Sequence, residues 1–233
     1  MPFVETPQKI TLIDIQPTFT TIYATSEDPK MYQAPCPAFE DGFLTDIAAF
    51  AQHAIAYAQT RELQLDEVLS IVVPASISRS FKQYLLQTFF ESLPNTRYVR
   101  LEYKCSFYLY GQQVSTAVVI EQDQFIQLTP VMNGFIQKEL LAYCSQEDLP
   151  QKITELYEKV NFFAKKQLSN ALLFCYQNDY EDAVSDQVEQ KTIYADDKLQ
   201  MLTDGIAAYF ALGNVQEEAF ERNETVEQWL LKM

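Results

Sequence analysis

The stretch that decides the fold is KITLIDIQPTFTTIYAT, residues 9–25. Apolar and β-branched residues fill both of its arms, and Pro17 separates them, which is the pattern of a β-hairpin. A second stretch of the same kind, VSTAVVIEQDQFIQLTPVM, occupies residues 114–132. The two hairpins predict a chain made of two similar halves, each of which begins with a hairpin.

Neither hairpin turn contains a glycine. The first turn runs through residues 14–18 and the second through residues 121–124. A turn that cradles a phosphate group normally needs glycine, because backbone N–H groups must approach the ligand and φ is often positive. Both turns therefore argue against a phosphate site at these places.

The rest of the first half alternates helical and extended patterns. A helix is predicted over residues 43–63 with Asp41 as its cap, followed by a buried parallel strand, VLSIVV, at residues 68–73. Ser78 is expected to cap the next helix, which Pro94 ends. A short strand and a short helix then follow at residues 97–101 and 102–110.

The second half repeats this order after its own hairpin. Its predicted helices cover residues 135–144, 149–167, 180–190, 199–212 and 224–231, and its predicted strands cover residues 171–176 and 191–194. Strands that alternate with helices favour an α/β fold in which helices cover the faces of sheets. The predicted domains are residues 1–111 and residues 112–233, and the second includes the C-terminal helix.

Charge and composition limit the expected partners. The 233 residues carry a net charge of −15, and the longest basic run is Lys165-Lys166. Nucleic acids and anionic membranes both require a concentrated positive surface, so neither is an expected partner. No apolar run approaches the ~20 residues of a transmembrane helix, and a signal-peptide pattern is lacking at the N-terminus. Four widely spaced cysteines indicate reduced core thiols and a cytoplasmic location.

The chain contains a single histidine, His53. Nucleophilic catalysis with a histidine base, or a histidine-based metal centre, would have to use it. His53 lies within a predicted helix, and nothing around it supports either role. We expect it to pack against the core or lie on the helix surface, and we predict no catalytic residue and no metal site.

The order of elements resembles the superfamily of actins, heat-shock ATPase chaperones and sugar kinases, and most closely the actins and actin-related proteins. The stretches that carry the resemblance are Val72-Val73-Pro74, residues 98–111, Thr129-Pro130-Val131 with Gly134-Phe135, and residues 201–207. It implies duplicated, ribonuclease-H-like halves, each with a mixed sheet flanked by helices. The segments available for the cleft-covering lid subdomains, residues 27–41 and 135–169, are short, so reduced lids are implied.

The resemblance also implies where a nucleotide would bind. If ATP and Mg²⁺ were held as in the family, the lining residues would be Asp14, Thr18, Glu102, Asp123 and Gly205. Asp14 and Thr18 match the first phosphate loop, Glu121 or Asp123 stands for the acid of the second, and Glu102 falls at the position of the catalytic glutamine.

Three departures from the family pattern coincide with this site. Gln16 and Pro17 replace small, flexible positions, the second loop has lost its glycines, and Tyr176-Gln177-Asn178 stands where a Gly-Gly pair lets the adenosine approach. We therefore expect a non-catalytic actin-like scaffold or adaptor that acts through protein contacts and uses no cofactor.

Three other functions remain open from the sequence. The chain is alternatively an ATP-binding switch with unorthodox phosphate loops, a filament or capping subunit, or an adaptor in a pilus or secretion assembly. For the last, residues 217–231 are predicted to form a helix that carries Phe220 and Trp229. We expect these two side chains to pack that helix onto the second half rather than to recruit a partner.

Overall fold

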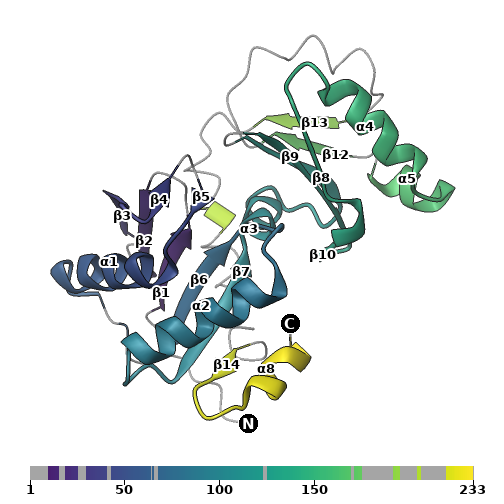
Figure 1. Ribbon diagram of the computed structural model, residues 1–233. Helices are drawn as coiled ribbons and strands as arrows, with labels where there is room; N and C mark the ends of the chain where they lie inside the picture. Colours follow the sequence, from purple (N-terminus) through teal and green to yellow (C-terminus); the bar gives the residue numbers. More distant parts are fainter. Residues whose placement is uncertain are drawn as a thin grey trace. The chain divides into compact units, whose positions relative to one another are not determined.

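The computed structural model describes residues 10–15, 19–25, 30–40, 43–63, 65, 68–122, 125–168, 171–174, 191–194, 204–205 and 219–232. The chain divides into two compact units. Unit 1 comprises Met1–Glu102 and Asn214–Met233, and unit 2 comprises Tyr103–Gly213. Each unit is built on a mixed sheet flanked by helices (Figure 1), so the predicted α/β class is confirmed.

The described strands of the main sheet in unit 1 follow the order β14-β7-β6-β1-β2-β3. They are β1 (Ile10–Ile15), β2 (Phe19–Thr25), β3 (Lys30–Pro35), β6 (Val68–Val73), β7 (Tyr98–Tyr103) and β14 (Phe220–Glu221). Strands β1, β2 and β3 are antiparallel, and β6 pairs with β1 in parallel. The predicted hairpin of residues 9–25 is therefore confirmed as β1 and β2. A separate ribbon joins β4 (Phe39–Glu40) to β5 (Phe43–Leu44).

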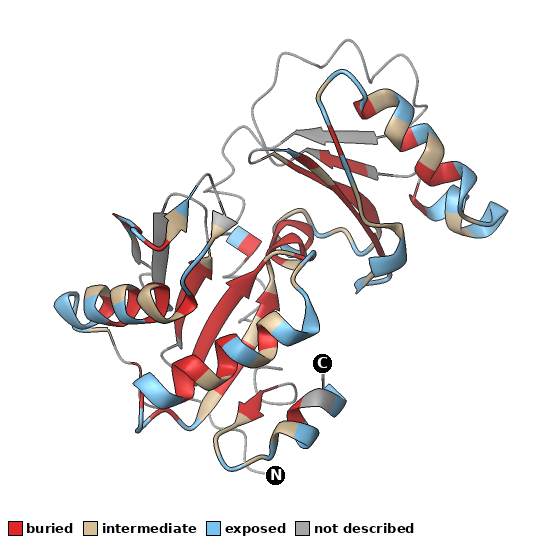
Figure 2. Ribbon diagram, viewed as in Figure 1, coloured by how far each residue is buried: buried red, intermediate tan, exposed pale blue. Residues whose placement is uncertain are grey.

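Two neighbouring helices of unit 1 pack on each other. They are α1 (Ile47–Thr60) and α2 (Arg79–Ser92), which contact each other, with the rings of Phe50 and Phe89 edge to face at 6.3 Å. Their buried residues form one stripe each, as Figure 2 shows. Such a stripe is what an amphipathic helix packs against a sheet.

Two capping residues were predicted for these helices, and the structure confirms one of them. The Ser78 hydroxyl accepts a hydrogen bond from the backbone N–H of Phe81 at 3.2 Å, as predicted. The predicted cap of the first helix, Asp41, is wrong. The helix begins at Ile47, and the Asp46 carboxylate accepts from the N–H of Ala49 at 2.9 Å. Residues 43–44 form β5, so the helix begins later in the sequence than predicted.

The C-terminal segment belongs to unit 1. Strand β14 pairs antiparallel with β7, and helix α8 (Val226–Lys232) packs on α2. The Trp229 ring stacks on Phe90 at 5.4 Å, and its Nε1–H donates to the Glu221 carbonyl at 3.1 Å. The assignment of this helix to the second half is therefore wrong, because its aromatic anchor lies on α2.

Unit 2 contains a sheet whose described strands run in the order β10-β9-β8-β12-β13, with β11 paired to β9. They are β8 (Ala117–Gln122), β9 (Ile126–Met132), β10 (Phe135–Ile136), β11 (Ala142–Cys144), β12 (Ala171–Phe174) and β13 (Lys191–Tyr194). Strands β8 and β9 form the second predicted hairpin, and β12 pairs in parallel with both β8 and β13. The path β3-β2-β1-β6-β7 in unit 1 thus has the same order as β10-β9-β8-β12-β13.

The helical segments of unit 2 are α3 (Lys104–Gly111), the 3-10 turn η1 (Lys138–Leu140), α4 (Leu149–Glu158) and α5 (Phe162–Leu168). A core cluster joins α4 and α5 to β8, β9 and β12 through Val118, Leu128, Ile153, Leu156, Leu168 and Leu172. Apolar residues from both layers bury one another here, which is the main stabilising term of such a unit.

Two helix predictions in unit 2 are wrong. Residues 135–144 form β10, η1 and β11 rather than a helix, because β10 and β11 both pair with β9. The predicted single helix of residues 149–167 is divided into α4 and α5. The Asn161 carboxamide oxygen accepts from the N–H of Ala164 at 3.0 Å and so starts a new helix.

Some predictions fall outside the described residues. These are the helix of residues 180–190, nearly all of the helix of residues 199–212, and Cys175. Of the four cysteines, Cys36, Cys105 and Cys144 are buried free thiols. Within the described ranges, every helix is too short or too polar to cross a membrane.

Candidate functional site

Among the described side chains in the sheet of unit 1, three charged ones are buried, on strands β1 and β7. Asp14 is 3% exposed on β1, Arg100 is 1% exposed on β7, and Glu102 is 7% exposed on β7. Asp14 and Glu102 are each the last but one residue of their strand. Charged groups are buried at such positions only when other groups compensate the lost hydration. These three residues form the candidate site.

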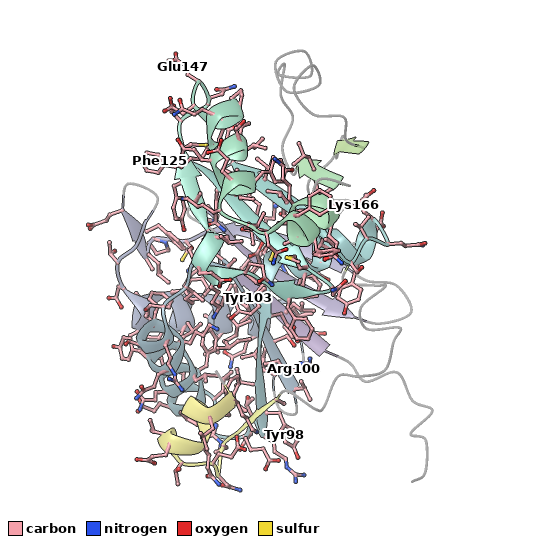
Figure 3. All side chains as sticks on the ribbon, turned by 90° about the vertical axis from the view of Figure 1, so that its right-hand side faces the viewer. Tyr98, Arg100, Tyr103, Phe125, Glu147 and Lys166 are labelled. Carbon is pink, nitrogen blue, oxygen red and sulfur yellow. The ribbon has the colours of Figure 1, made fainter. Side chains whose placement is uncertain are left out.

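Arg100 and Glu102 form an ion pair within β7. The Arg100 Nε lies 2.7 Å from Glu102 Oε1. Side chains two residues apart point to the same face of a strand, whereas on a helix they do not meet. Figure 3 shows Arg100 on β7, between Tyr98 and Tyr103. The extended backbone of β7 is therefore what makes this pair possible.

The location of Glu102 corrects its predicted surroundings. The sequence placed it at the exposed start of a short helix, but α3 begins at Lys104 and Glu102 is a buried strand residue. The alternation of Val99 and Leu101 with Arg100 and Glu102 continues the strand up to Tyr103. The helix does end at Gly111, as predicted.

Asp14 is placed by the register of β1. It pairs with Thr21 of β2 on one side and with Val72 of β6 on the other. Because residues in register share a face, Asp14 lies on the face of Leu12 and Ser70. The Ser70 hydroxyl is fully buried and makes no hydrogen bond within the described part of the chain. This face therefore carries both a buried carboxylate and a buried hydroxyl.

Strands β6 and β7 bring Asp14 and Glu102 into one sheet. Strand β6 lies between β1 and β7, and α2 connects β6 to β7. Figure 1 draws both arrows pointing towards α3, as expected when a helix crosses between parallel neighbours. Asp14 and Glu102 thus lie near the carboxyl ends of strands in one sheet, where ligands of α/β proteins commonly bind.

Unit 2 buries a carboxylate and a thiol near each other. Glu121 is 8% exposed on β8, and Cys105 is fully buried on α3, which contacts β8. Burial raises the pKa of the Cys105 thiol well above its ordinary value, and the negative charge of Glu121 raises that pKa further. The thiol is therefore protonated at neutral pH and is a packing group rather than a nucleophile.

Gly205 allows a close backbone approach within unit 2. A Cβ atom at this position would lie 1.8 Å from the Phe107 carbonyl oxygen and 2.5 Å from its carbon. No side chain fits in that space, so residues 204–205 contact the α3 backbone because position 205 is glycine. The structure thus gives Gly205 a packing role within its own unit.

The five predicted nucleotide-site residues have different outcomes. Asp14 and Glu102 belong to the sheet of unit 1, and Gly205 belongs to unit 2. Thr18 and Asp123 lie outside the described residues, as do Gln16, Pro17 and residues 176–178. The structure therefore brings together two of the five residues, Asp14 and Glu102, in one sheet.

Arg100 is the site residue that the sequence reasoning missed. Its signal was present, because an arginine and a glutamate two residues apart on a short strand share a face. His53 is partly buried on α1, as expected. Among the described residues, no group of three or more His, Cys, Asp or Glu side chains is arranged to hold a metal ion.

The chain was compared with protein-family models and with curated proteins. No protein-family model matches the chain, and no curated protein matches it significantly.

Proposed function

We propose that the protein is a non-catalytic scaffold or adaptor that keeps a duplicated actin-like core and acts through protein–protein contacts in the cytoplasm. The shared strand order of the two sheets supports the duplication, because three antiparallel strands are followed in both by a strand parallel to the first. The short segment between β3 and α1, residues 36–46, supports a reduced lid in unit 1.

The observation that carries this proposal is the ion pair of Arg100 and Glu102. A carboxylate that orients water or hydrated Mg²⁺ must present its oxygens to the ligand. Glu102 is nearly inaccessible, and one of its oxygens lies 2.7 Å from a guanidinium nitrogen. Catalysis at this position would require the buried pair to separate, which is energetically costly.

The loop sequences support the same proposal. Pro17 provides no N–H donor, and Gln16 brings a side chain to the position where the family has a small residue. Loss of glycine in both turns removes the backbone approach on which phosphate binding relies.

Isothermal titration of the full chain with Mg-ATP tests the proposal. We expect no saturable heat at any nucleotide concentration used, and no phosphate release. Saturable binding that is lost in Asp14→Ala would instead support the alternative, an ATP-binding switch with unorthodox loops. That alternative is favoured by one observation, the location of Asp14 and Glu102 near the ends of strands in one sheet.

A further inference from the structure

Strands β9 and β10 are joined by a two-residue hairpin turn. Met132 pairs with Phe135, so the turn consists of Asn133 and Gly134, and both of these residues are exposed. The φ angle is 51° at Asn133 and 82° at Gly134. Positive φ at both positions, together with the sequence Asn-Gly, is typical of a type I′ turn, whose backbone twist matches that of the two strands. The sequence and the conformation of this turn therefore agree.

Asn-Gly is also the pair of residues in which asparagine loses ammonia most readily. Once deprotonated, the backbone nitrogen of the residue that follows an asparagine can attack the side-chain Cγ and close a cyclic imide. A Cβ atom on that residue hinders the attack, and glycine has none. The sequence contains Asn-Gly once, at Asn133-Gly134, and a residue with a side chain follows every other asparagine. Asn133 is therefore chemically the most reactive asparagine of the chain.

In the folded chain, however, the attacking nitrogen is held in a hydrogen bond. The Gly134 N–H donates to the Ser115 carbonyl at 2.8 Å, and this bond must break before the nitrogen can lose its proton. The Asn133 N–H donates to Thr116 Oγ1 at 2.9 Å, and the same hydroxyl lies 3.5 Å from Asn133 Oδ1. Ser115 and Thr116 directly precede β8, so the chain that leads into β8 holds both residues of the turn.

We propose that Asn133 is a deamidation site that the fold keeps intact while the turn stays bonded to Ser115 and Thr116. When these bonds open, the Gly134 nitrogen gives its proton to a solvent base and forms a bond to Asn133 Cγ. The bond between Cγ and Nδ2 then breaks, and ammonia leaves after it takes up a proton from water. A water molecule adds to either carbonyl of the imide and yields aspartate or isoaspartate at position 133.

The products change the charge and the backbone of this turn. Both add a carboxylate, and isoaspartate also carries the main chain through the side-chain carbon, which inserts a methylene into the turn. A type I′ turn sets the register of its two strands, so the inserted methylene weakens the pairing of Phe135 with Met132. The amount of product records how long this edge of unit 2 has been open, and it does not depend on the scaffold function proposed above.

Peptide mapping by mass spectrometry tests this proposal on the full chain. The chain is incubated at mildly alkaline pH with and without guanidinium chloride, and the mass increase at Asn133 is followed over time. We expect the reaction to be at least about tenfold faster in the unfolded chain, because tenfold corresponds to about one hydrogen bond and two hold the turn. Asn95 and Asn161, which Thr96 and Phe162 follow, should react more slowly than Asn133 in the unfolded chain.

Thr116→Val removes the hydroxyl that accepts from Asn133 and keeps the shape of the side chain. Under native conditions this variant should deamidate roughly two- to tenfold faster than the parent chain, which is the range given by the net contribution of one hydrogen bond. Thr154→Val is the matched control, because its exposed hydroxyl lies on α4 of the same unit and donates to the Pro150 carbonyl. The rate at Asn133 should be unchanged in this control.

Three results would overturn the proposal. They are equal rates at Asn133 in the folded and unfolded parent chain, a faster reaction at Asn95 or Asn161 in the unfolded chain, and a rate in folded Thr116→Val equal to that of the parent. Thermal unfolding checks that both variants are folded. In guanidinium chloride, both variants should react at the rate of the parent chain, because the hydrogen bonds of the turn are absent there.

Discussion

Units 1 and 2 have the same strand order, but their sheets differ in the charged side chains that they bury and in the strands at their edges. The sheet of unit 1 buries Asp14, Arg100 and Glu102, and its β7 edge is extended by β14, after which α8 packs on α2. The described part of the sheet in unit 2 buries one charged side chain, Glu121, and no comparable C-terminal strand is seen there. The comparison teaches that the two sheets share their strand order without sharing buried charges or the protection of an edge strand.

Removing the buried cation should produce the largest effect and should affect unit 1. Arg100→Met removes the guanidinium that pairs with the buried Glu102 carboxylate, which should lower the free energy of unfolding by about 3–5 kcal/mol. Urea unfolding followed by the fluorescence of Trp229 measures this, because the chain has one tryptophan and it lies in unit 1.

The double variant Arg100→Met with Glu102→Leu is the control. Replacing both members of a buried pair with apolar residues is often nearly neutral, so most of the stability should return. Equal instability of the single and double variants would show that packing at Arg100 matters more than its charge.

Removing the aromatic anchor of α8 should loosen the C-terminal segment, so that β7 loses the support of β14 and becomes a less protected edge strand. Trp229→Ala removes the stacking on Phe90 and should cost about 3 kcal/mol. Hydrogen exchange measured by mass spectrometry should speed up in α2 and β7 and stay unchanged in β8 and β9. Leu231→Ala, at an 88% exposed position of the same helix, should change stability by less than about 0.5 kcal/mol. Faster exchange in β8 would contradict the division of the chain into these units.

A methyl group at position 205 should disturb unit 2 without disturbing unit 1. Gly205→Ala places its Cβ against the Phe107 carbonyl, and relieving that overlap should cost about 1–3 kcal/mol. Hydrogen exchange in α3 reports the change. Gly134→Ala is a useful comparison, because Gly134 has φ of +82° and open space around it, so its cost of about 1 kcal/mol arises from backbone conformation alone.

Acidification should produce the smallest effect, at the C-terminal edge of unit 1. Burial alone would raise the pKa of Glu224, but hydrogen bonds from Lys232 and from the Glu221 N–H outweigh it and lower that pKa. A carboxyl whose pKa is lower in the folded state stabilises the fold above its ordinary pKa, and this contribution disappears as the pH falls through the folded value. The ion pair is partly exposed, so the loss should stay below about 1 kcal/mol.

Urea unfolding as a function of pH checks this last prediction. Glu224→Gln should be slightly less stable than the parent chain at neutral pH and should match it at acidic pH. A constant difference across the whole pH range would show that the carboxylate charge is not involved.

The sequence predicted correctly the elements that are determined by their own local residue pattern. Both hairpins, the fully buried β6 and the Ser78 cap are local signals, and the structure confirms each. The prediction of a helix at residues 135–144 was wrong. Residues 135–136 and 142–144 pair with β9, and this pairing overrides the helical preference of the local sequence.

The candidate site was only partly predictable for the same reason. Asp14 was identified from the resemblance to the family's first phosphate loop, and its burial follows from the two strands on either side of β1. Glu102 was identified but placed on the wrong kind of element, and Arg100 was missed. Their pairing depends on how far β7 extends before α3 begins, and the sequence prediction ended the strand at residue 101, two residues too early.

The return of the chain to unit 1 has a consequence for synthesis on the ribosome. Unit 2 is inserted between β7 and β14, so residue 103 is made well before residue 220, the first residue of β14. At about 5–20 residues per second, roughly ten seconds separate the two. During that interval the β7 edge is not yet paired with β14, so chaperones or neighbouring chains can bind to it.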